Sequence, residues 1–196
     1  MKKANYINLS RRSFIGGSAA LLASCGLWLC GCAQKNAEPN VDGTITASVS
    51  YSSQNCNPIG NTSALFCAAG WHVFEGLYEF DFSDYSTFNG LAAMKPQKIS
   101  NLQYQVVLRD GAKFSNGEQV TANDVVNAFN QNVMDATYGA YLQSISKMTA
   151  TDSKTVLIDL KYPFDELLEK RLAILRIFPA SLSTTQLSTN PIGSGP

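Results

Sequence analysis

Residues 109–129 read RDGAKFSNGEQVTANDVVNAF, and this stretch decides the local fold of the chain around it. Asp110-Gly111 and Asn116-Gly117 are strong turn signals, because both pairs tolerate a positive φ. The following Thr121-Ala-Asn-Asp124 predicts a capping box, in which the threonine and the aspartate satisfy free amides at the start of a helix. Three apolar side chains then recur on one helical face: Val125, Val126 and Phe129. The stretch therefore predicts two tight turns followed by a capped amphipathic helix.

The same stretch resembles a known family signature. Residues 108–129 follow the pattern Leu-Arg-Asp-Gly-x-x-Phe-x-(Asn/Asp)-Gly-x-x-(Val/Leu)-Thr-Ala-x-Asp-Val-Val-x-(Ala/Ser)-Phe. This pattern is similar to the signature region of the family 5 extracellular solute-binding proteins, the dipeptide, oligopeptide and nickel receptors of ABC importers. The alternative interpretation is an arbitrary β-turn-helix unit without family meaning.

Other stretches carry the resemblance further. Phe74-Glu75-Gly76-Leu77 resembles a helix-to-strand passage of the family, and residues 191–196, Pro-Ile-Gly-Ser-Gly-Pro, resemble a family landmark. The match is poorer after Gly90-Leu91, where Ala93 and Met94 replace an acid and a serine. The resemblance covers residues 44–196 but only the N-terminal portion of a complete receptor. We therefore expect a chain truncated at this landmark, or a shorter derivative of such a receptor.

The residue patterns also predict the elements of the fold. Strands are expected where apolar and polar residues alternate, at 44–51, 103–108, 144–150 and 155–160. Helices are expected at 65–74, after Thr121, and at 165–173, where Asp165 can serve as the N-cap. The expected fold class is α/β, a mixed sheet with helices. By resemblance, it is the N-terminal part of a two-lobed fold like that of periplasmic binding proteins.

Residues 65–74 place Leu65, Ala68, Ala69 and Val73 on or near one helical face. For two further segments the sequence predicts polarity or burial but no helix or strand. Residues 81–87 are polar and predict a connector, whereas residues 174–179 are apolar and predict a buried segment.

The first 31 residues predict an export signal. Lys2, Lys3, Arg11 and Arg12 form a basic region without an acid, and an uncharged run from Phe14 to Gly31 follows. Arg11 and Arg12 lie in Ser-Arg-Arg-Ser-Phe-Ile, which closely matches the twin-arginine export signature. An ordinary secretory signal with two adjacent arginines is the alternative.

The end of the uncharged run predicts a lipid anchor. Leu29-Cys30-Gly31-Cys32 looks like a bacterial lipobox, so Cys32 would receive a diacylglyceryl group and become the mature N-terminus. Residues 32–43 are polar and aperiodic, which indicates a flexible tether. The expected location is the outer face of the cell membrane or the periplasm. An uncleaved transmembrane helix is the alternative, although glycines and serines dilute the run.

Composition and net charge narrow the range of binding partners. The chain of 196 residues has 15 basic and 15 acidic residues. Without the four basic residues of the leader, 11 basic residues face 15 acidic ones, a formal charge of −4. Such a surface does not favour nucleic acid or anionic lipid, and no basic run with interleaved aromatic residues is present.

The cysteines and the single histidine limit the chemistry. Cys56 and Cys67 remain after the leader and Cys32, and the sequence leaves open whether they form a disulfide or two separate thiols. His72 is the one histidine, so this chain cannot supply a histidine zinc site or a Ser-His-Asp triad, and we expect it to be a packing residue. We expect no enzyme activity, no metal and no cofactor.

The resemblance implies a function. Receptors of this family capture a solute between two lobes and deliver it to a permease in the membrane. The loop before the first helix contributes to their ligand cleft, and the matching positions are Thr62, Ser63 and Ala64. A plain surface turn is the alternative interpretation of these three residues. The expected partners are a peptide or another small solute, ABC permease subunits and the membrane through the lipid anchor. We expect a monomer.

Two further hypotheses remain open on the sequence. The chain could be a truncated or derived receptor without transport activity. It could instead be an exported enzyme or redox protein, as the twin-arginine route suggests, although no cofactor motif supports this.

Overall fold

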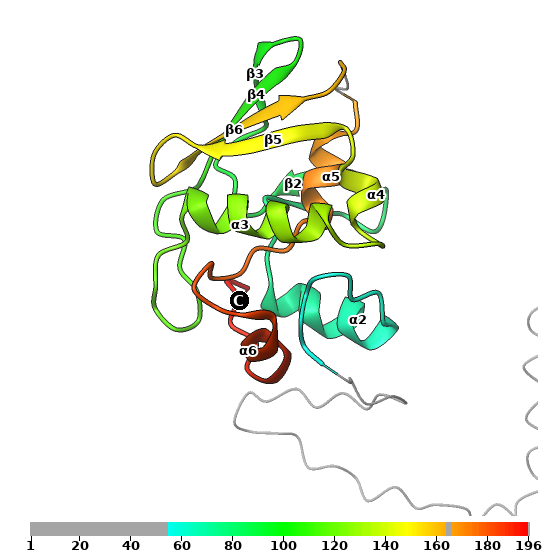
Figure 1. The fold of residues 1–196 in the computed structure, drawn as a ribbon, viewed down its shortest axis with the longest axis vertical. Coiled ribbons are helices and arrows are strands. Elements are labelled where there is room, and N and C mark those ends of the chain that lie inside the picture. The colour runs from blue at the N-terminus through cyan, green and yellow to red at the C-terminus, as the bar shows by residue number, and fades with distance from the viewer. Residues whose placement is uncertain (1–54, 164–165, 196) are drawn as a thin grey trace, which may run out of the picture. The chain divides into compact units, whose positions relative to one another are not determined.

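The computed structural model describes residues 55–163 and 166–195 of the chain (Figure 1). The predicted leader, the tether, the strand at 44–51 and the cap residue Asp165 lie outside these residues. None of the helices in the described ranges combines the length and the apolar character that a membrane span requires.

A four-stranded antiparallel sheet forms one layer. Its order is β3 (Gln97–Ser100), β4 (Gln103–Val107), β6 (Thr155–Leu160) and β5 (Ile145–Ala150). Burial alternates along β4 and β6, so that one face of the sheet is apolar and the other is half-exposed. The three strands predicted at 103–108, 144–150 and 155–160 are therefore confirmed.

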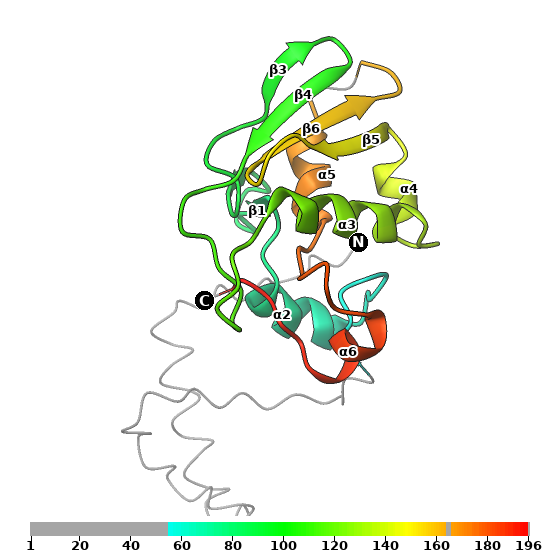
Figure 2. The same ribbon diagram turned by 60° about the vertical axis from the view of Figure 1, so that its left-hand side comes forward.

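Helix α3 (Ala122–Val133) covers the apolar face of the sheet, as both views show (Figures 1 and 2). It begins after Thr121, whose backbone N–H donates to Asp124 Oδ2 over 2.8 Å and whose hydroxyl donates to the same oxygen over 2.7 Å. Val125 and Phe129 are buried, whereas Asn123 is exposed. The predicted capped helix with one apolar face is confirmed.

A small hairpin was not predicted. It consists of β1 (Tyr78–Phe80) and β2 (Thr87–Asn89), joined by the polar residues that the sequence indicated as a connector. Helix α5 (Leu168–Ile174) packs against both strands and begins after Leu167, later than the expected start at residue 165. The sequence did not predict this hairpin because strands of three residues are too short to show an alternating pattern.

Helix α2 (Ala64–Val73) confirms the helix predicted at 65–74, but its buried face is different. Phe66 and Gly70 face the core together with Phe74, whereas Ala68 and Ala69 are exposed. The face with Leu65, Ala68, Ala69 and Val73 is therefore not the most buried face of the helix. Because α2 is apolar around its whole circumference, periodicity could not select the face that packs inward.

Two short helices complete the described fold. Helix α4 (Gly139–Leu142) follows α3, and helix α6 (Thr184–Thr189) lies near α2 on the far side of α3 from the sheet (Figures 1 and 2). The segment between α5 and α6 is buried at Leu175, Ile177 and Phe178, as the apolar pattern predicted. The fold class, a mixed α/β fold, is confirmed.

Candidate functional site

The residues that carry the family resemblance contact one another. Arg109 Nη2 lies 3.0 Å from Glu75 Oε2 and 3.2 Å from Glu75 Oε1, and Arg109 Nε donates to the carbonyl of Gly90 over 3.1 Å. Three stretches that are far apart in the sequence thus meet at one guanidinium, whose planar shape suits two-point bonding to a carboxylate. This arrangement joins the end of α2, the segment after β2 and the end of β4.

The last landmark joins the same framework. Gly195 N donates to Val73 O over 2.9 Å, and Ser115 N donates to Gly193 O over 2.8 Å. A Cβ atom at Gly195 would lie 1.9 Å from His72 O, and one at Gly193 would lie 2.0 Å from Val73 O. Only glycine permits the backbone to approach the last turn of α2 this closely. The segment therefore connects α2 with the turn that precedes α3.

The turns of the signature also serve the fold. Gly111 and Gly117 have φ of 72° and 89°, as the Asp-Gly and Asn-Gly pairs predicted. Asp110 forms an ion pair with Lys154 of the β5–β6 turn, and this contact holds the pKa of Asp110 below its usual value. Asp124 accepts a hydrogen bond from Ala180 N over 2.8 Å, besides capping α3. Asp110 and Asp124 of the signature therefore bond to other segments of the fold.

The predicted contact residues Thr62, Ser63 and Ala64 lie together at the N-terminus of α2, and all three are exposed. Ser63 is the N-cap, because its Oγ accepts a hydrogen bond from Phe66 N over 3.2 Å. Its hydroxyl is therefore engaged within the helix. Thr62 and the free amides of the first turn are the groups that the loop can offer to a ligand.

Neighbouring residues hold this loop in place. The Asn61 carboxamide oxygen accepts from Ser63 N over 3.2 Å, and the Asn61 carbonyl accepts from the hydroxyl of Tyr138 over 3.1 Å. Burial raises the pKa of Tyr138, so its hydroxyl stays protonated and able to donate. The loop is thus an exposed edge on a fixed support.

One buried charge was not predicted. Arg176 is 3% exposed and pairs with Glu79 through contacts of 2.7 and 2.8 Å from Nη1. Its guanidinium also donates to the carbonyls of Phe74 and Ala173 and lies 4.1 Å from the ring centre of Trp71. The sequence signal for this ion pair was the single arginine within the apolar run 172–179. An arginine in a buried segment needs a partner for its charge.

The carboxylates near the hairpin do not form a pair with each other. Glu75 bonds to Arg109 and Glu79 bonds to Arg176, so each has its own arginine. His72 is exposed in the last turn of α2, which corrects the expectation of a packing histidine. No group of three or more His, Cys, Asp or Glu side chains in the described ranges could hold a metal ion.

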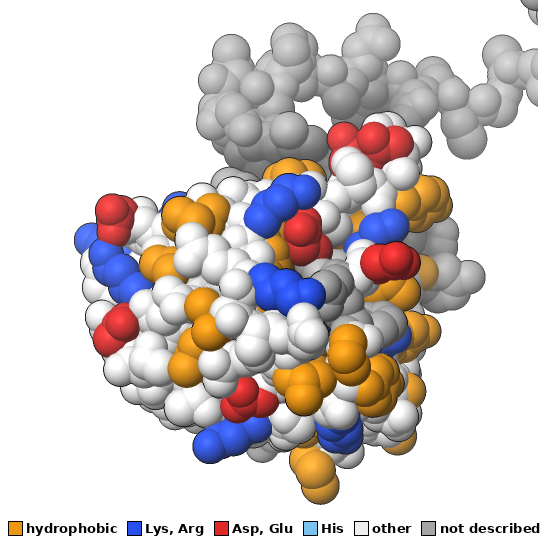
Figure 3. Space-filling view, turned by 90° about the horizontal axis from the view of Figure 1, so that it is seen from above, with side chains coloured by type: hydrophobic (Ala, Val, Ile, Leu, Met, Phe, Trp, Pro, Cys, Tyr) orange, Lys and Arg blue, Asp and Glu red, His pale blue; other side chains and the backbone are white. Residues whose placement is uncertain are grey.

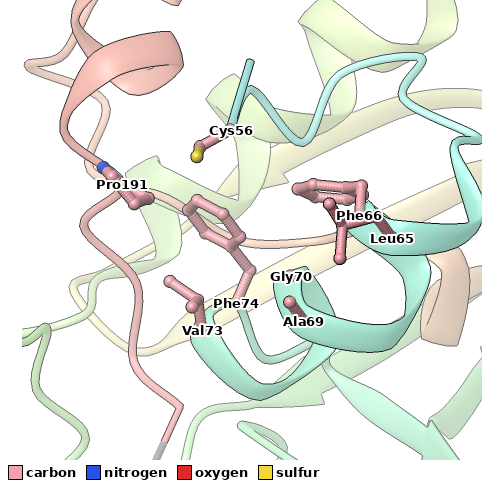
Figure 4. A pocket seen from close by; sticks show the side chains of 8 residues that line it. All are labelled: Cys56, Leu65, Phe66, Ala69, Gly70, Val73, Phe74 and Pro191. Atoms are coloured by element: carbon pink, nitrogen blue, oxygen red, sulfur yellow. The ribbon is translucent and has the colours of Figure 1, made fainter. Parts of the chain in front are cut away.

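Cys56 and Cys67 are separate, half-buried thiols in the structure. Cys56 lines a pocket of about 90 Å³ between α2 and Pro191 (Figure 4). The other lining residues belong to α2 or follow it directly, and the lining is entirely apolar. A solute site normally combines an apolar lining with a few convergent polar groups, so this pocket is a poor candidate.

The surface shows no concentration of one charge on the face in Figure 3, where acidic and basic side chains are interspersed. This distribution agrees with the absence of a basic stripe in the sequence. It provides no electrostatic footprint for nucleic acid on that face.

Comparison with known proteins adds a family to this geometry. Residues 89–196 match the family model described as "Bacterial extracellular solute-binding proteins, family 5 Middle". The glutathione-binding protein GsiB of Escherichia coli O6:K15:H31 (strain 536 / UPEC) is 28% identical over 190 residues, which cover 93% of this chain and 34% of GsiB. The chain thus spans about a third of the length of this relative.

Solved structures show the same fold. The oligopeptide-binding protein OppA of Listeria monocytogenes, bound to peptide, has a TM-score of 0.65 at 21% identity over 73% of this chain and 33% of OppA. The solute-binding protein MoaA of A. tumefaciens R10, in complex with mannopinic acid, has a TM-score of 0.64 at 24% identity over 74% of this chain and 32% of MoaA. At these identities the likeness concerns the fold.

Proposed function

This chain belongs to the bacterial extracellular solute-binding proteins of family 5, and on that premise we propose that it is the substrate-binding component of an ABC importer. In this role it captures a solute outside the cytoplasm and delivers it to a membrane permease. The observation that carries the proposal is the match of residues 89–196 to the family. The contacts among Arg109, Glu75 and Gly90 support it, because they show a framework built from the family's landmarks.

Peptides are the ligand class that we propose. The OppA structure that this chain resembles is bound to peptide, whereas the MoaA structure is in complex with mannopinic acid. The loop at Thr62, Ser63 and Ala64 supports a peptide, since it offers exposed main-chain groups next to a helix N-terminus. Main-chain bonding suits extended peptides of many sequences, because the backbone pattern is common to all of them.

Export and anchoring complete the proposal. Arg11 and Arg12 direct export, residues 1–31 are removed, and Cys32 carries the lipid that holds the mature protein at the membrane. Residues 32–43 then serve as a tether, and residues 44–196 form the N-terminal segment of the solute-binding domain. The proposed export agrees with the description of the family as extracellular.

The proposed function is tested by uptake in the source cells. Deleting the coding sequence should abolish or strongly reduce the accumulation of a radiolabelled tripeptide, and the intact gene supplied in trans should restore it. A labelled sugar serves as the control for general transport. Unchanged accumulation of tri- and pentapeptides in the deletion strain would contradict the peptide importer.

The anchor is tested separately. Cys32→Ala should move the protein from the membrane fraction to the soluble fraction, because the thiol is the only proposed site of lipid attachment. Cys30→Ala is the matched control, since it changes a neighbouring thiol in the same run. Retention of the Cys32→Ala protein on membranes at the level of the control would argue for a different mode of attachment.

A further inference from the structure

An aromatic cluster, defined here as Trp71, Phe80 and Phe82, lies where the β1–β2 hairpin meets the last turn of α2; Trp71 and Phe80 are half-buried. The ring centres of Trp71 and Phe82 lie 5.3 Å apart, those of Trp71 and Phe80 lie 6.2 Å apart, and those of Phe80 and Phe82 lie 6.4 Å apart. Phe82 is nevertheless 63% exposed, and Tyr85 in the same turn is 65% exposed. Large aromatic side chains left in water at the tip of a hairpin indicate a surface that contacts another molecule.

Two carboxylates accompany these rings. Asp81 and Asp84 flank Phe82 in the turn and are exposed. The Ser86 backbone N–H donates to Asp84 Oδ1 over 2.8 Å and lowers the pKa of Asp84, so this group stays ionised. Residues 78–89 contain no basic residue, and their third acid, Glu79, is already paired with Arg176. The exposed tip therefore carries two carboxylates beside aromatic rings, and Lys170 of α5 acts on Asp84 from outside the hairpin.

This combination has a defined chemical preference. The face of an aromatic ring attracts a cation, and a guanidinium can also bond a carboxylate through two N–H groups. The hairpin base shows the same pairing internally, where Arg176 lies over the Trp71 ring and bonds Glu79. At the tip, Asp81 and Asp84 with Phe82 and Tyr85 present the carboxylate and ring components without an arginine from residues 78–89.

We propose that the tip of the β1–β2 hairpin is an interaction surface for an arginine side chain exposed on a partner protein. The partner's guanidinium bonds to Asp81 or Asp84 and stacks on Phe82. The tip is separate from the candidate ligand loop, because Trp71 lies in the last turn of α2 and Ser63 caps its first. The inference does not depend on the importer function.

The test uses the full chain with Trp28→Phe, which leaves Trp71 as its one tryptophan. The probe is the peptide Gly-Arg-Gly-Arg-Gly, and its matched control replaces both arginines with uncharged citrulline. We expect a saturable change in Trp71 fluorescence with the arginine peptide and none with the citrulline peptide. Phe82→Ala should weaken binding about threefold, because one cation–ring contact is lost.

Substitution of the carboxylates gives the decisive comparison. Asp81→Asn with Asp84→Asn should weaken binding about fivefold, because neither position then offers the guanidinium an ionised carboxylate. Asparagine keeps the oxygen that accepts from Ser83 N and Ser86 N, so the turn is retained. Glu118→Gln and Tyr141→Ala, at exposed positions outside the hairpin, should bind like the parent. Equal binding of the citrulline peptide, or an unchanged affinity of the double asparagine variant, would overturn the proposal.

Discussion

The turn that begins at Arg109 and the loop that contains Thr62 differ in their contacts and in their exposure, although both lie beside α2. Arg109 bonds to Glu75 and to the Gly90 carbonyl, and the neighbouring Asp110 and Ser115 bond to Lys154 and Gly193. Thr62 and Ala64, in contrast, are exposed. The first region holds parts of the chain together, whereas the second is open to another molecule.

This difference explains why the two regions carry different information. A residue that joins several distant segments cannot change without cost to the fold, so the family is recognisable there. A loop that is exposed on a fixed support can change with little cost, so its sequence says less about the family and more about the ligand. The signature identifies the family, and the loop at Thr62 is the better candidate for contact.

The largest expected effect is at the buried pair between Arg176 and Glu79. Arg176→Ala leaves Glu79, whose side chain is only 17% exposed, without its cation, so we expect a loss of about 3 kcal/mol in the free energy of unfolding. Urea denaturation followed by circular dichroism measures it. The double variant Arg176→Met with Glu79→Leu should recover part of this loss, and a single variant as stable as the parent would contradict the scaffold role of the pair.

The second-largest effect on stability is expected at Gly195, one of the two glycines of the last landmark. Gly195→Ala should cost about 2 kcal/mol, because the new methyl group would overlap the carbonyl of His72 and force the backbone apart. The same denaturation experiment measures the change. Gly117→Asn is the control, since nothing lies within 4 Å of a Cβ there and asparagine tolerates a positive φ. Equal stability of the two variants would show that the close approach is unimportant.

A smaller effect is expected at the signature arginine. Arg109→Ala should cost about 1 kcal/mol, because the pair with Glu75 is partly exposed to water and is screened. A double-mutant cycle with Glu75→Gln isolates the interaction of the two side chains. Additive effects of the two substitutions would mean that the pair does not stabilise the framework.

The smallest effect separates the two regions most clearly. Thr62→Ala should change the free energy of unfolding by less than about 0.5 kcal/mol, because the side chain is exposed. Ser63→Ala should cost about 1 kcal/mol, since it removes the N-cap of α2. Thermal unfolding compares both with the parent. A strong loss for Thr62→Ala would place this residue in the scaffold and not in an open loop.

The sequence predicted most of the larger elements. The strands at 103–108, 144–150 and 155–160 and the helix after Thr121 all have long periodic patterns, and all are present. The hairpin β1–β2, with strands of three residues, was missed because so few residues cannot show a period. The buried face of α2, which includes Phe66 and Gly70, was not predicted, because a helix that is apolar all round has no preferred face until it packs.

Less of the candidate site could be predicted. The resemblance pointed to Thr62, Ser63 and Ala64, and the structure brings them together at the start of α2, although their contact with a ligand stays a prediction. The bonds of Arg109 to Glu75 and Gly90 and the pairing of Arg176 with Glu79 join residues 19 to 97 positions apart in the sequence. Such pairs depend on tertiary packing, which local sequence patterns do not describe.

Hydrogen exchange of the full chain tests the central claim most directly, because it compares the two regions in one sample. The amides of Arg109, Ser115 and Gly195 donate to backbone carbonyls of other segments, whereas Ser63 N–H bonds to the nearby side chain of Asn61 within the same loop. We predict that the amides of Arg109, Ser115 and Gly195 exchange as slowly as those of β6, and that the amides of residues 61–64 exchange rapidly. Rapid exchange at Arg109 and Gly195, with protection at Thr62 and Ser63, would contradict the account.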